Sequence, residues 1–311
     1  MKESLVSVIV PNYCHARFLD QRIQSILNQT YQDFELIILD DCSLDDGASR
    51  AVIEKYRDNP HVSKIVYNEV NSGSPFKQWD KGINLAKGEL IWIAESDDYC
   101  EGNFLETLVN EFERDGNLTL AYTLVRRVDS EGKLIRELCI SPYGVTRLAG
   151  KNYIKKYMTL GNHCRNASAC VFKKAAYEKT DRQYLTYKAG GDMLFWIEIA
   201  EHGNVVIINK VLSYFRSHSQ RVTPKSSKNG VIMFEYKKTI DHIMQMGIIS
   251  EKRKKMMMDY VHYKLLTNKF EREDLRERLL RYWNFSGVMK WYTIVRVYVS
   301  KSIQTRLGIY L

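Results

Sequence analysis

Proline, sequence repeats and long apolar runs are scarce or missing in this chain. Its 311 residues include only 5 prolines and are 45% hydrophobic, with no low-complexity tract and no internal repeat. Such a chain can bury a sizeable core in one main domain with appended elements. No run reaches the roughly 18 consecutive apolar residues of a membrane-spanning helix, so we expect no transmembrane segment.

Cysteines are few, and their spacing is irregular. The chain has 6 of them, without a Cys-x-x-Cys pair and without a secretory signal. This usage fits a reducing cytosol better than a disulfide scaffold, so we expect a cytoplasmic protein. His163 with Cys164 and Cys170 suggests a zinc set, but no second His completes it, and zinc is set aside. The Asn-x-Ser/Thr matches are then chance occurrences: Asn28, Asn117, Asn166 and Asn284.

Three carboxylates follow one apolar run. The run Leu90–Ala94 predicts a strand buried on both faces, and Glu95, Asp97 and Asp98 come directly after it. Open α/β sheets bind ligands outside the carboxyl ends of their strands, and clustered carboxylates there repel one another unless a cation joins them. Oxygen ligands favour Mg2+ or Mn2+ over zinc. The alternative is that residues 96–98 only cap a helix that begins near Glu101.

A second acid pair favours the metal interpretation. The apolar run from Phe34 ends in Asp40 and Asp41, and a helix is expected to open near Asp45. Further strands are predicted at residues 5–10 and 64–67, with a helix over residues 76–86 before the Leu90 strand. The pattern is βαβα, so the acids share one edge of a mostly parallel sheet.

Four motifs in this order resemble the inverting glycosyltransferases of family 2, which have the GT-A fold. They are Ser7-Val-Ile-Val-Pro-Asn-Tyr13, Asp40-Asp-Cys-Ser-Leu-Asp45, Asn71-Ser-Gly73, and Gly88-Glu-Leu-Ile followed by Glu95-Ser-Asp-Asp98. The resemblance covers roughly the first 220 residues. It implies that a nucleotide-sugar donor is held by residues at the ends of the first two strands: Pro11, Tyr13, Asp40 and Asp41.

The acids after the Leu90 strand match the metal and diphosphate motif of that family, usually Asp-x-Asp. Here Glu95 stands in the first position, and its longer side chain cannot keep the same geometry without a shift. We therefore assign the Mn2+ or Mg2+ ion to Asp97 and Asp98, with Glu95 as a ribose contact and Asp97 also near the nucleotide. The resemblance further implies His218 as a third metal ligand and Arg216 as a diphosphate or loop contact.

Cys14 is a second departure from the family pattern. With its neighbour His15 it suggests a nucleophilic or metal-binding pair. A direct displacement needs no enzyme nucleophile, however, and a buried structural thiol is the commoner role of a lone cysteine. We set the pair aside.

The segment Lys188–Glu198 supplies a general base. Gly190 and Gly191 permit a tight turn, and Asp192 is predicted to cap an apolar helix. The catalytic acid of the family occupies this place, which makes Asp192 the candidate that takes a proton from the acceptor hydroxyl. A role as helix cap alone is the alternative, and the two roles are compatible. A helix N-terminus is expected to keep the pKa of this carboxylate low.

Positive charge is concentrated at the end of the chain. Residues 251–311 carry 14 Lys or Arg and 6 Asp or Glu, so they contribute +8 of the total +9. Basic residues starting at Lys252 alternate with Trp291, Tyr292 and Tyr298, which suits peripheral contact with an anionic membrane. The alternative for residues 251–281 is an ordinary helical subdomain that packs on the catalytic domain or on a second subunit of a homo-oligomer.

Three other functions fit the sequence less well. A nucleic-acid-binding protein would carry basic and aromatic residues at the ligand edge, whereas this edge is acidic, so no nucleic acid partner is expected. A nucleotidyltransferase would open with a Gly-rich basic loop, but residues 11–16 contain no glycine. An inactive sugar-nucleotide-binding relative would lack the acid cluster or Asp192.

We therefore predict an α/β protein with the GT-A fold: a Rossmann-like, mostly parallel sheet with flanking helices, and a helical C-terminal tail. Residues 1–98 form the nucleotide-sugar-binding half, residues 99–223 the acceptor-binding half, and residues 224–311 a basic helical region. In the middle part, strands at residues 120–128 and 134–138 flank a hairpin turn, and residues 151–160 form a helix.

The predicted activity is metal-dependent, inverting transfer of a hexose from a nucleoside-diphosphate donor. The family pattern favours UDP as the nucleotide. The acceptor is a hydroxyl of a glycan or a lipid-linked molecule, and the setting is bacterial surface polysaccharide synthesis, of O-antigen or capsule type. The place of action is the cytoplasm, at the inner face of the cell membrane if the tail binds lipid.

Overall fold

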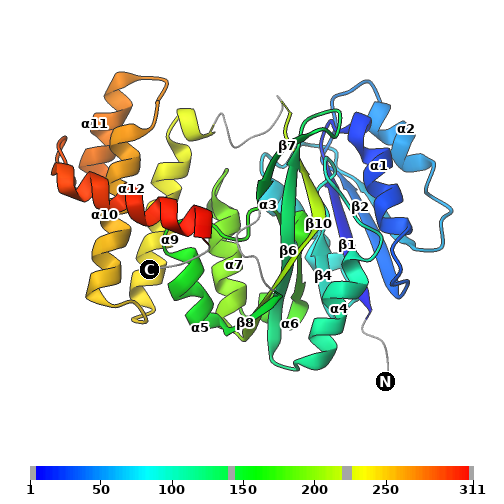
Figure 1. Cartoon of the computed structure of the whole chain (residues 1–311). Coiled ribbons are helices and arrows are strands. Elements are labelled where there is room, and N and C mark those ends of the chain that lie inside the picture. The colour runs from blue at the N-terminus through cyan, green and yellow to red at the C-terminus, as the bar shows by residue number, and fades with distance from the viewer. Residues whose placement is uncertain (1–4, 139–143, 219–225, 308–311) are drawn as a thin grey trace.

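One 10-stranded sheet organises the molecule (Figure 1). The computed structural model describes residues 5–138, 144–218 and 226–307. The strand order is β3-β2-β1-β4-β9-β6-β10-β5, with β7 paired to β6 and β8 paired to β10. The strands are β1 Val6–Asn12, β2 Phe34–Asp40, β3 Val62–Tyr67, β4 Leu90–Ile93, β5 Tyr99–Cys100, β6 Leu118–Val128, β7 Leu134–Leu138, β8 Val145–Ala149, β9 Cys170–Lys173 and β10 Asn204–Arg216.

The N-terminal half of the sheet is parallel, as predicted. Strand β1 lies between β2 and β4, and β3 pairs with β2. In the register of β1 with β2, Asn12 lies opposite Asp40, so both strands end at the same edge. The acids that follow β2 and β4 therefore stand together at the carboxyl ends of neighbouring strands.

The second half of the sheet is mixed. Strand β9 runs antiparallel between β4 and β6, while β6 and β10 are parallel. The predicted strands at residues 120–128 and 134–138 are confirmed as β6 and β7, an antiparallel pair. Strands β5, β8 and β9, of 2, 5 and 4 residues, were not predicted.

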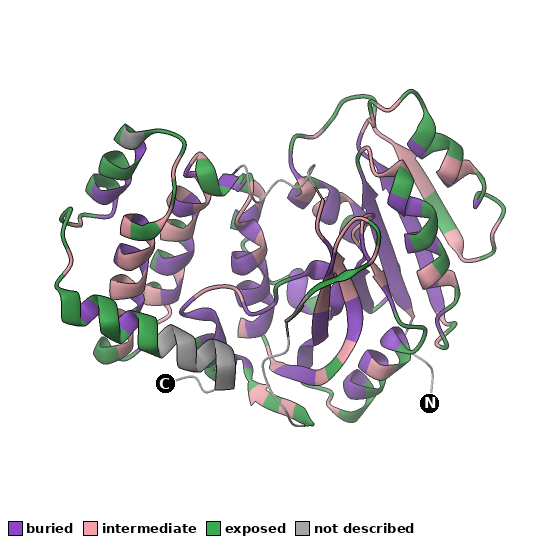
Figure 2. Cartoon of the chain, turned by 45° about the horizontal axis from the view of Figure 1, so that its top comes forward, coloured by how far each residue is buried: buried purple, intermediate pink, exposed green. Residues whose placement is uncertain are grey.

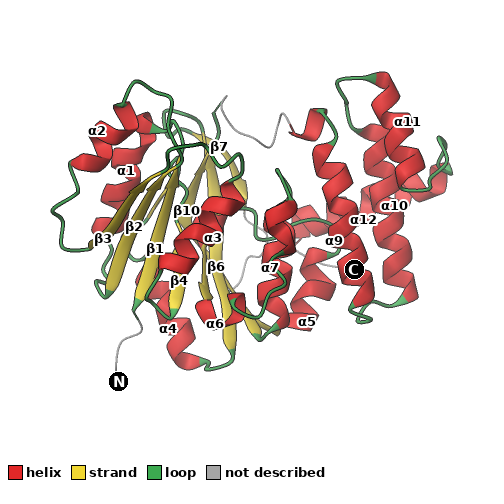
Figure 3. Ribbon diagram, turned by 180° about the vertical axis from the view of Figure 1, so that it is seen from behind, coloured by secondary structure: helices red, strands yellow, loops and turns green. Residues whose placement is uncertain are grey.

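Helices cover both faces of the sheet (Figure 3). Successive residues of β1 point to opposite sides: Val8 packs in the cluster with α1, α2 and α4, and Ile9 packs in the cluster with α3 and α7. The helices are α1 Ala16–Leu27, α2 Ala48–Glu54, α3 Pro75–Leu85, α4 Phe104–Arg114, α5 Gly150–Tyr153, α6 Lys174–Tyr177, α7 Gly191–Glu201, α9 Val231–Gln245, α10 Glu251–Thr267, α11 Glu273–Tyr282 and α12 Trp291–Leu307.

One alternative and one expectation about helix starts do not match the structure. Residues 95–98, which follow β4, are called the acid loop. The helix after this loop is α4, which begins at Phe104 after β5, so residues 96–98 do not cap it. Asp192 is not the cap of α7: Gly190 occupies the cap position, and Asp192 lies in the first turn. The predicted helix over residues 151–160 is present as α5 followed by a π-helical turn at Ile154–Met158.

The C-terminal helices pack against the catalytic domain. One hydrophobic cluster joins Trp79 and Phe195 with Ile240, Met257 and Leu279 of α9, α10 and α11. Arg253 of α10, part of the first basic cluster of the tail, donates from Nε to Thr159 Oγ1 over 2.8 Å. Of the two interpretations of residues 251–281, packing on the catalytic domain is confirmed. Within the described residues, no helix has the length and apolarity needed to cross a bilayer.

Gly150 offers a test of the junction between α5 and α7. A Cβ atom at this position would lie 1.6 Å from the carbonyl oxygen of Ala200 and 2.5 Å from that of Gly203, both backbone atoms. We expect Gly150→Ala to lower the free energy of unfolding in urea by about 2–3 kcal/mol, because backbone must move to remove the overlap. Gly116→Ala, where a Cβ meets nothing within 4 Å, is the control and should change it by no more than about 0.5 kcal/mol. Equal stability of the two variants would contradict this packing.

Candidate active site

Asp40 ties the ends of β1 and β2 together. Its carboxylate accepts hydrogen bonds from Asn12 Nδ2 (2.8 Å), Ser43 N (3.0 Å) and Ser43 Oγ (2.6 Å). Asp40 and the neighbouring Pro11 are both buried. The two residues therefore shape the edge of the expected nucleotide pocket from within the sheet.

Asp41 organises the loop that follows β3. It accepts hydrogen bonds from Asn68 Nδ2 (2.6 Å), Gln78 Nε2 (2.9 Å), and the backbone N (2.9 Å) and Oγ (2.7 Å) of Ser72. Its side chain is buried, whereas Tyr13 nearby is 43% exposed. Among the residues predicted to contact the nucleotide at these two strand ends, Tyr13 thus presents the most accessible surface.

Glu95 lies in a low-dielectric setting beside two other acids. Trp79 donates from Nε1 to Glu95 Oε1 over 2.7 Å. Burial, followed by the charge of Asp97, raises the pKa of Glu95 to about 8. A carboxylate with such a pKa is stabilised in its charged form by any cation that binds nearby.

Asp98 holds the acid loop in place. It accepts hydrogen bonds from Asn166 Nδ2 (2.9 Å), Ser168 Oγ (2.7 Å) and the backbone N of Arg216 (3.0 Å). Asp98 is 1% exposed, and burial together with the charge of Asp97 raises its pKa. Protein donors occupy both of its oxygens, which differs from the metal-ligand role that we expected for it.

Arg216 is committed to protein acceptors. Its guanidinium donates to the carbonyl oxygens of Asp97 (2.9 Å) and Ser130 (3.0 Å) and to Gln21 Oε1 (2.6 Å). It also lies over the rings of Phe18 and Tyr99, 4.7 and 5.2 Å from their centroids. Of its two expected roles, this geometry favours the loop contact over the diphosphate contact.

His15, Asp97 and His218 form a group that fits a metal ion. Their candidate ligand atoms all lie within 4.8 Å of one another. His218 Nε2 is 2.9 Å from Asp97 Oδ2, and its Nδ1 is buried without a hydrogen-bond partner among the described residues. Burial raises the pKa of Asp97, but the hydrogen bond from His218 and the nearby imidazoles outweigh it and lower that pKa. Burial lowers the pKa of His15, which favours the neutral imidazole that binds metals.

His15 belongs to this group, although the sequence did not predict it as a metal ligand. His15 was set aside together with Cys14, whereas the structure places it beside Asp97 and His218. The available signal was its position: it follows β1 at the same edge to which β2 and β4 deliver their acids. Asp98 is not a member of this group, although Asp97 and His218 were both predicted.

Asp192 has a raised pKa, contrary to the sequence-based expectation. Asn162 Nδ2 donates to its Oδ2 over 2.8 Å, and the backbone N of Met193 donates to its Oδ1 over 2.9 Å. Burial raises the pKa of Asp192 to about 6 and outweighs these hydrogen bonds. At neutral pH the carboxylate is therefore mostly ionised, and it is a stronger base than an exposed aspartate.

Glu235 of α9 holds the loop that leads to Asp192. Its carboxylate accepts hydrogen bonds from three consecutive backbone N–H groups, those of Lys188 (2.5 Å), Ala189 (3.1 Å) and Gly190 (2.8 Å). Its charge also contributes, after burial, to the raised pKa of Asp192. Sequence reasoning missed Glu235, because nothing in the local pattern links residue 235 to a loop 45 positions earlier.

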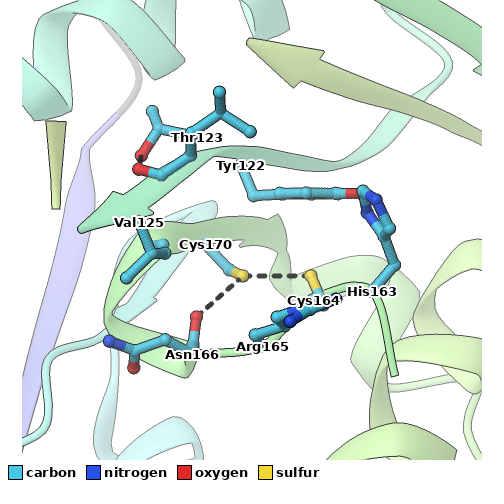
Figure 4. Close-up of a pocket in the computed structure, with 10 residues that line it drawn as sticks. Tyr122, Thr123, Val125, His163, Cys164, Arg165, Asn166 and Cys170 are labelled. Carbon is cyan, nitrogen blue, oxygen red and sulfur yellow. Dashed lines mark hydrogen bonds between the residues drawn. The ribbon is translucent and has the colours of Figure 1, made fainter. Parts of the chain in front are cut away.

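A small pocket lies between β6 and residues 163–170 (Figure 4). Its lining residues are Tyr122, Thr123, Leu124, Val125, His163, Cys164, Arg165, Asn166, Ala169 and Cys170. Asn162, next to the pocket in the sequence, binds Asp192, and Asn166 binds Asp98. His163 Nδ1 pairs with the hydroxyl of Tyr122 at 2.6 Å, while Cys164 and Cys170 contact each other at 3.1 Å.

Comparison with known proteins agrees with these features. The sequence model described as Glycosyl transferase family 2 matches residues 7–180. A chondroitin synthase of Escherichia coli is 28% identical over 207 residues, which cover 67% of this chain and 28% of that protein. The poly(ribitol-phosphate) beta-N-acetylglucosaminyltransferase TarP of Staphylococcus aureus is 28% identical over 215 residues, covering 68% of this chain and 62% of TarP. The chain thus spans less than two thirds of the length of either relative.

Solved structures share the fold. S. aureus TarS 1–349 in complex with UDP-GlcNAc superposes with a TM-score of 0.59 at 18% sequence identity, over 96% of this chain and 81% of that chain. The same fragment in complex with UDP gives a TM-score of 0.56 at 19% identity, over 90% of this chain and 72% of that chain. The predicted GT-A fold is confirmed.

The three-residue group can be tested by metal binding. Asp97→Asn and His218→Ala should each weaken Mn2+ binding by at least about tenfold, because each removes one ligand or its charge. The free ion is counted by electron paramagnetic resonance in a Mn2+ titration, with circular dichroism as a check of folding. Asp58→Asn, a change at an exposed acid outside the site, is the control. If folded Asp98→Asn loses Mn2+ while Asp97→Asn keeps it, the ion is held by Asp98 and the group has been misassigned.

Proposed function

Because the chain belongs to glycosyl transferase family 2, we propose that it is a metal-dependent inverting glycosyltransferase. The proposal is supported chiefly by the hydrogen bonds of residues 162–168. Asn162 binds the candidate base Asp192, and Asn166 and Ser168 bind Asp98 of the acid loop. A base and a metal-binding loop are thereby fixed with respect to each other, as a single displacement between two bound substrates requires.

The donor we propose is a UDP-sugar. Its nucleotide would lie at the ends of β1 and β2, with Tyr13 as the accessible ring and with Pro11, Asp40 and Asp41 shaping the pocket. Glu95 would contact the ribose, and Asp97 would lie near the diphosphate. Support for UDP comes from the TarS structures, which share the fold and whose bound molecules are UDP and UDP-GlcNAc.

The residues present fit a divalent metal ion. His15, Asp97 and His218 would hold it, and their mixture of nitrogen and oxygen ligands suits Mn2+ better than Mg2+. When bound, the ion neutralises charge on the diphosphate leaving group. Asp98 and Arg216 would serve this site indirectly, by keeping the acid loop in position.

Asp192 would act as the general base. The acceptor oxygen forms a bond to the anomeric carbon, the bond from that carbon to the diphosphate oxygen breaks, and the hydroxyl proton passes to Asp192. Attack opposite the leaving group inverts the anomeric configuration. Asn162 leaves one oxygen, Oδ1, buried without a partner among the described residues, so a substrate hydroxyl near the base could donate to it.

We propose surface polysaccharide synthesis as the setting, of O-antigen or capsule type. The support is the similarity to a chondroitin synthase and to TarP, a poly(ribitol-phosphate) beta-N-acetylglucosaminyltransferase. The acceptor would be a hydroxyl of a glycan or of a lipid-linked molecule. The cytoplasmic face of the membrane would be the place of action, with the basic C-terminal region in contact with anionic lipid.

Replacing the base tests the proposed reaction. Asp192→Asn should lower transfer from UDP-sugar by about 100-fold or more while UDP binding is kept, because the amide cannot accept the proton. In the wild type, kcat/KM should fall as the pH drops through about 6, since protonated Asp192 is inactive as a base. Radiolabelled transfer and calorimetric UDP titration provide the measurements. A parallel loss of UDP affinity would assign Asp192 a structural role instead.

Glu235 provides a second test, as a positioning residue. In Glu235→Gln the side-chain amide cannot accept all three backbone hydrogen bonds, so the loop before Asp192 should shift and displace the base. We therefore expect kcat to fall by about tenfold or more. Removing its negative charge should also lower the pKa of Asp192 and move the acidic limb of the pH profile to lower pH. Asp241→Asn on the exposed side of α9 is the matched control. A lower kcat with an unmoved limb would argue against electrostatic coupling between the two carboxylates.

A further inference from the structure

Helix α12 presents a continuous apolar surface to solvent. Its outward side chains are large and exposed: Trp291 is 75%, Tyr298 is 63% and Val295 is 51% accessible. Residues 291, 295 and 298 follow the i, i+4, i+7 spacing of one helix face, and Tyr292 and Val299 flank them. Figure 2 shows this helix as an exposed element along the edge of the C-terminal helices. We call this surface, Trp291, Tyr292, Val295, Tyr298 and Val299, the α12 face.

The helix touches the rest of the protein along a narrow line. Thr293 and Val297, one turn apart, are its buried side chains among those described, and Arg296 forms an ion pair with Asp259 of α10. The contact fixes the helix on α10 without covering its aromatic residues. A solvent-exposed apolar patch of this kind usually marks an interaction site.

The segment that carries the α12 face has basic residues and no acidic ones. From Tyr282 to Leu311 the chain has four Lys or Arg residues and no Asp or Glu. Exposed Lys290 has its ammonium 5.9 Å from the centroid of the Tyr292 ring, so positive charge and aromatic surface adjoin. The earlier basic cluster is less available, since Lys254 pairs with Glu251 and Arg253 binds Thr159.

We propose that the α12 face docks the protein on the surface of an anionic lipid bilayer. Exposed Trp and Tyr next to exposed Lys290, on a segment that itself carries no acidic residue, match the chemistry of the membrane interface, where aromatic rings lie at headgroup depth and basic residues meet anionic lipid. A second copy of the chain is disfavoured as occupant, because pairing two such faces would bring like charges together. The α12 face would make the membrane contact that is part of the proposed function, on which this inference rests.

Trp291 makes the docking directly measurable. The other four tryptophans are buried, at 0 to 4% exposure, so Trp291 is the tryptophan whose emission reports on this surface. On addition of vesicles of phosphatidylglycerol and phosphatidylcholine we expect a blue shift of its emission and protection from iodide quenching. Pure phosphatidylcholine vesicles should give neither, and binding should weaken as salt shortens the screening length, ~10 Å at 0.1 M. The vesicle assay contains no sugar donor or acceptor. Its result is therefore the same whether or not the protein transfers a sugar.

Variants separate the two components of the surface. Binding in vesicle co-sedimentation should fall by about tenfold or more in the double variant Trp291→Ser with Tyr298→Ser, and by roughly fivefold in Lys290→Gln. The double change to Phe at both positions keeps the apolar area and should bind. Ile135→Ser, at a 51% exposed residue of β7, is the control for loss of an exposed apolar side chain.

Two outcomes would overturn the proposal. One is a wild-type protein that ignores anionic vesicles at low salt while its circular dichroism is that of a folded protein. The other is a double Ser variant that binds vesicles as wild type but changes the molar mass seen by light scattering, which would assign the α12 face to contact between copies of the chain.

Discussion

Buried carboxylates at the carboxyl ends of the strands are the constraint on which the site depends. A carboxylate inside a protein must be paired or hydrogen-bonded, because an unsatisfied charge there costs several kcal/mol (~3–5 for a broken buried pair). Asp41 meets this requirement through residues 68–78, and Asp98 through residues 166–168 and the end of β10. Each acid thus fixes loops that are far away in the sequence. Asp97, the residue before Asp98 in the same loop, lies beside His15 and His218.

The parallel half of this arrangement could be predicted from the sequence because its signals are local. An apolar run followed by acids predicts both a buried strand and the edge where it ends, as at β2 and β4. The place of the antiparallel strand β9 between β4 and β6 depends on pairing with segments about 50 or more positions away. His15 could not be assigned from the sequence either, because its neighbours in space, Asp97 and His218, are far from it along the chain.

Burial has a larger effect on the pKa of Asp192 than its position at a helix N-terminus. The helix N-terminus does favour a negative charge, by roughly 0.3–1 kcal/mol at exposed positions. Asp192 lies in the first turn of α7, yet its surroundings include the apolar core around Phe195 and the negative charge of Glu235. Desolvation and the like charge act in the opposite direction and outweigh the dipole. The sequence predicts where the helix begins, but it does not show which residues pack around Asp192. The direction of the pKa shift therefore could not be predicted from the sequence.

Composition also suggested a basic tail separate from the catalytic domain, whereas the structure joins the two. Glu235 on α9 fixes the loop before Asp192, and Trp283, which follows α11, donates from Nε1 to the carbonyl oxygen of Met233 on the same helix over 3.1 Å. Helix α12 in turn rests on α10, whose Met257 shares a hydrophobic cluster with Ile240 of α9. A protein docked through the α12 face would therefore hold its base at a defined place relative to the bilayer, because rigid packed helices connect the two.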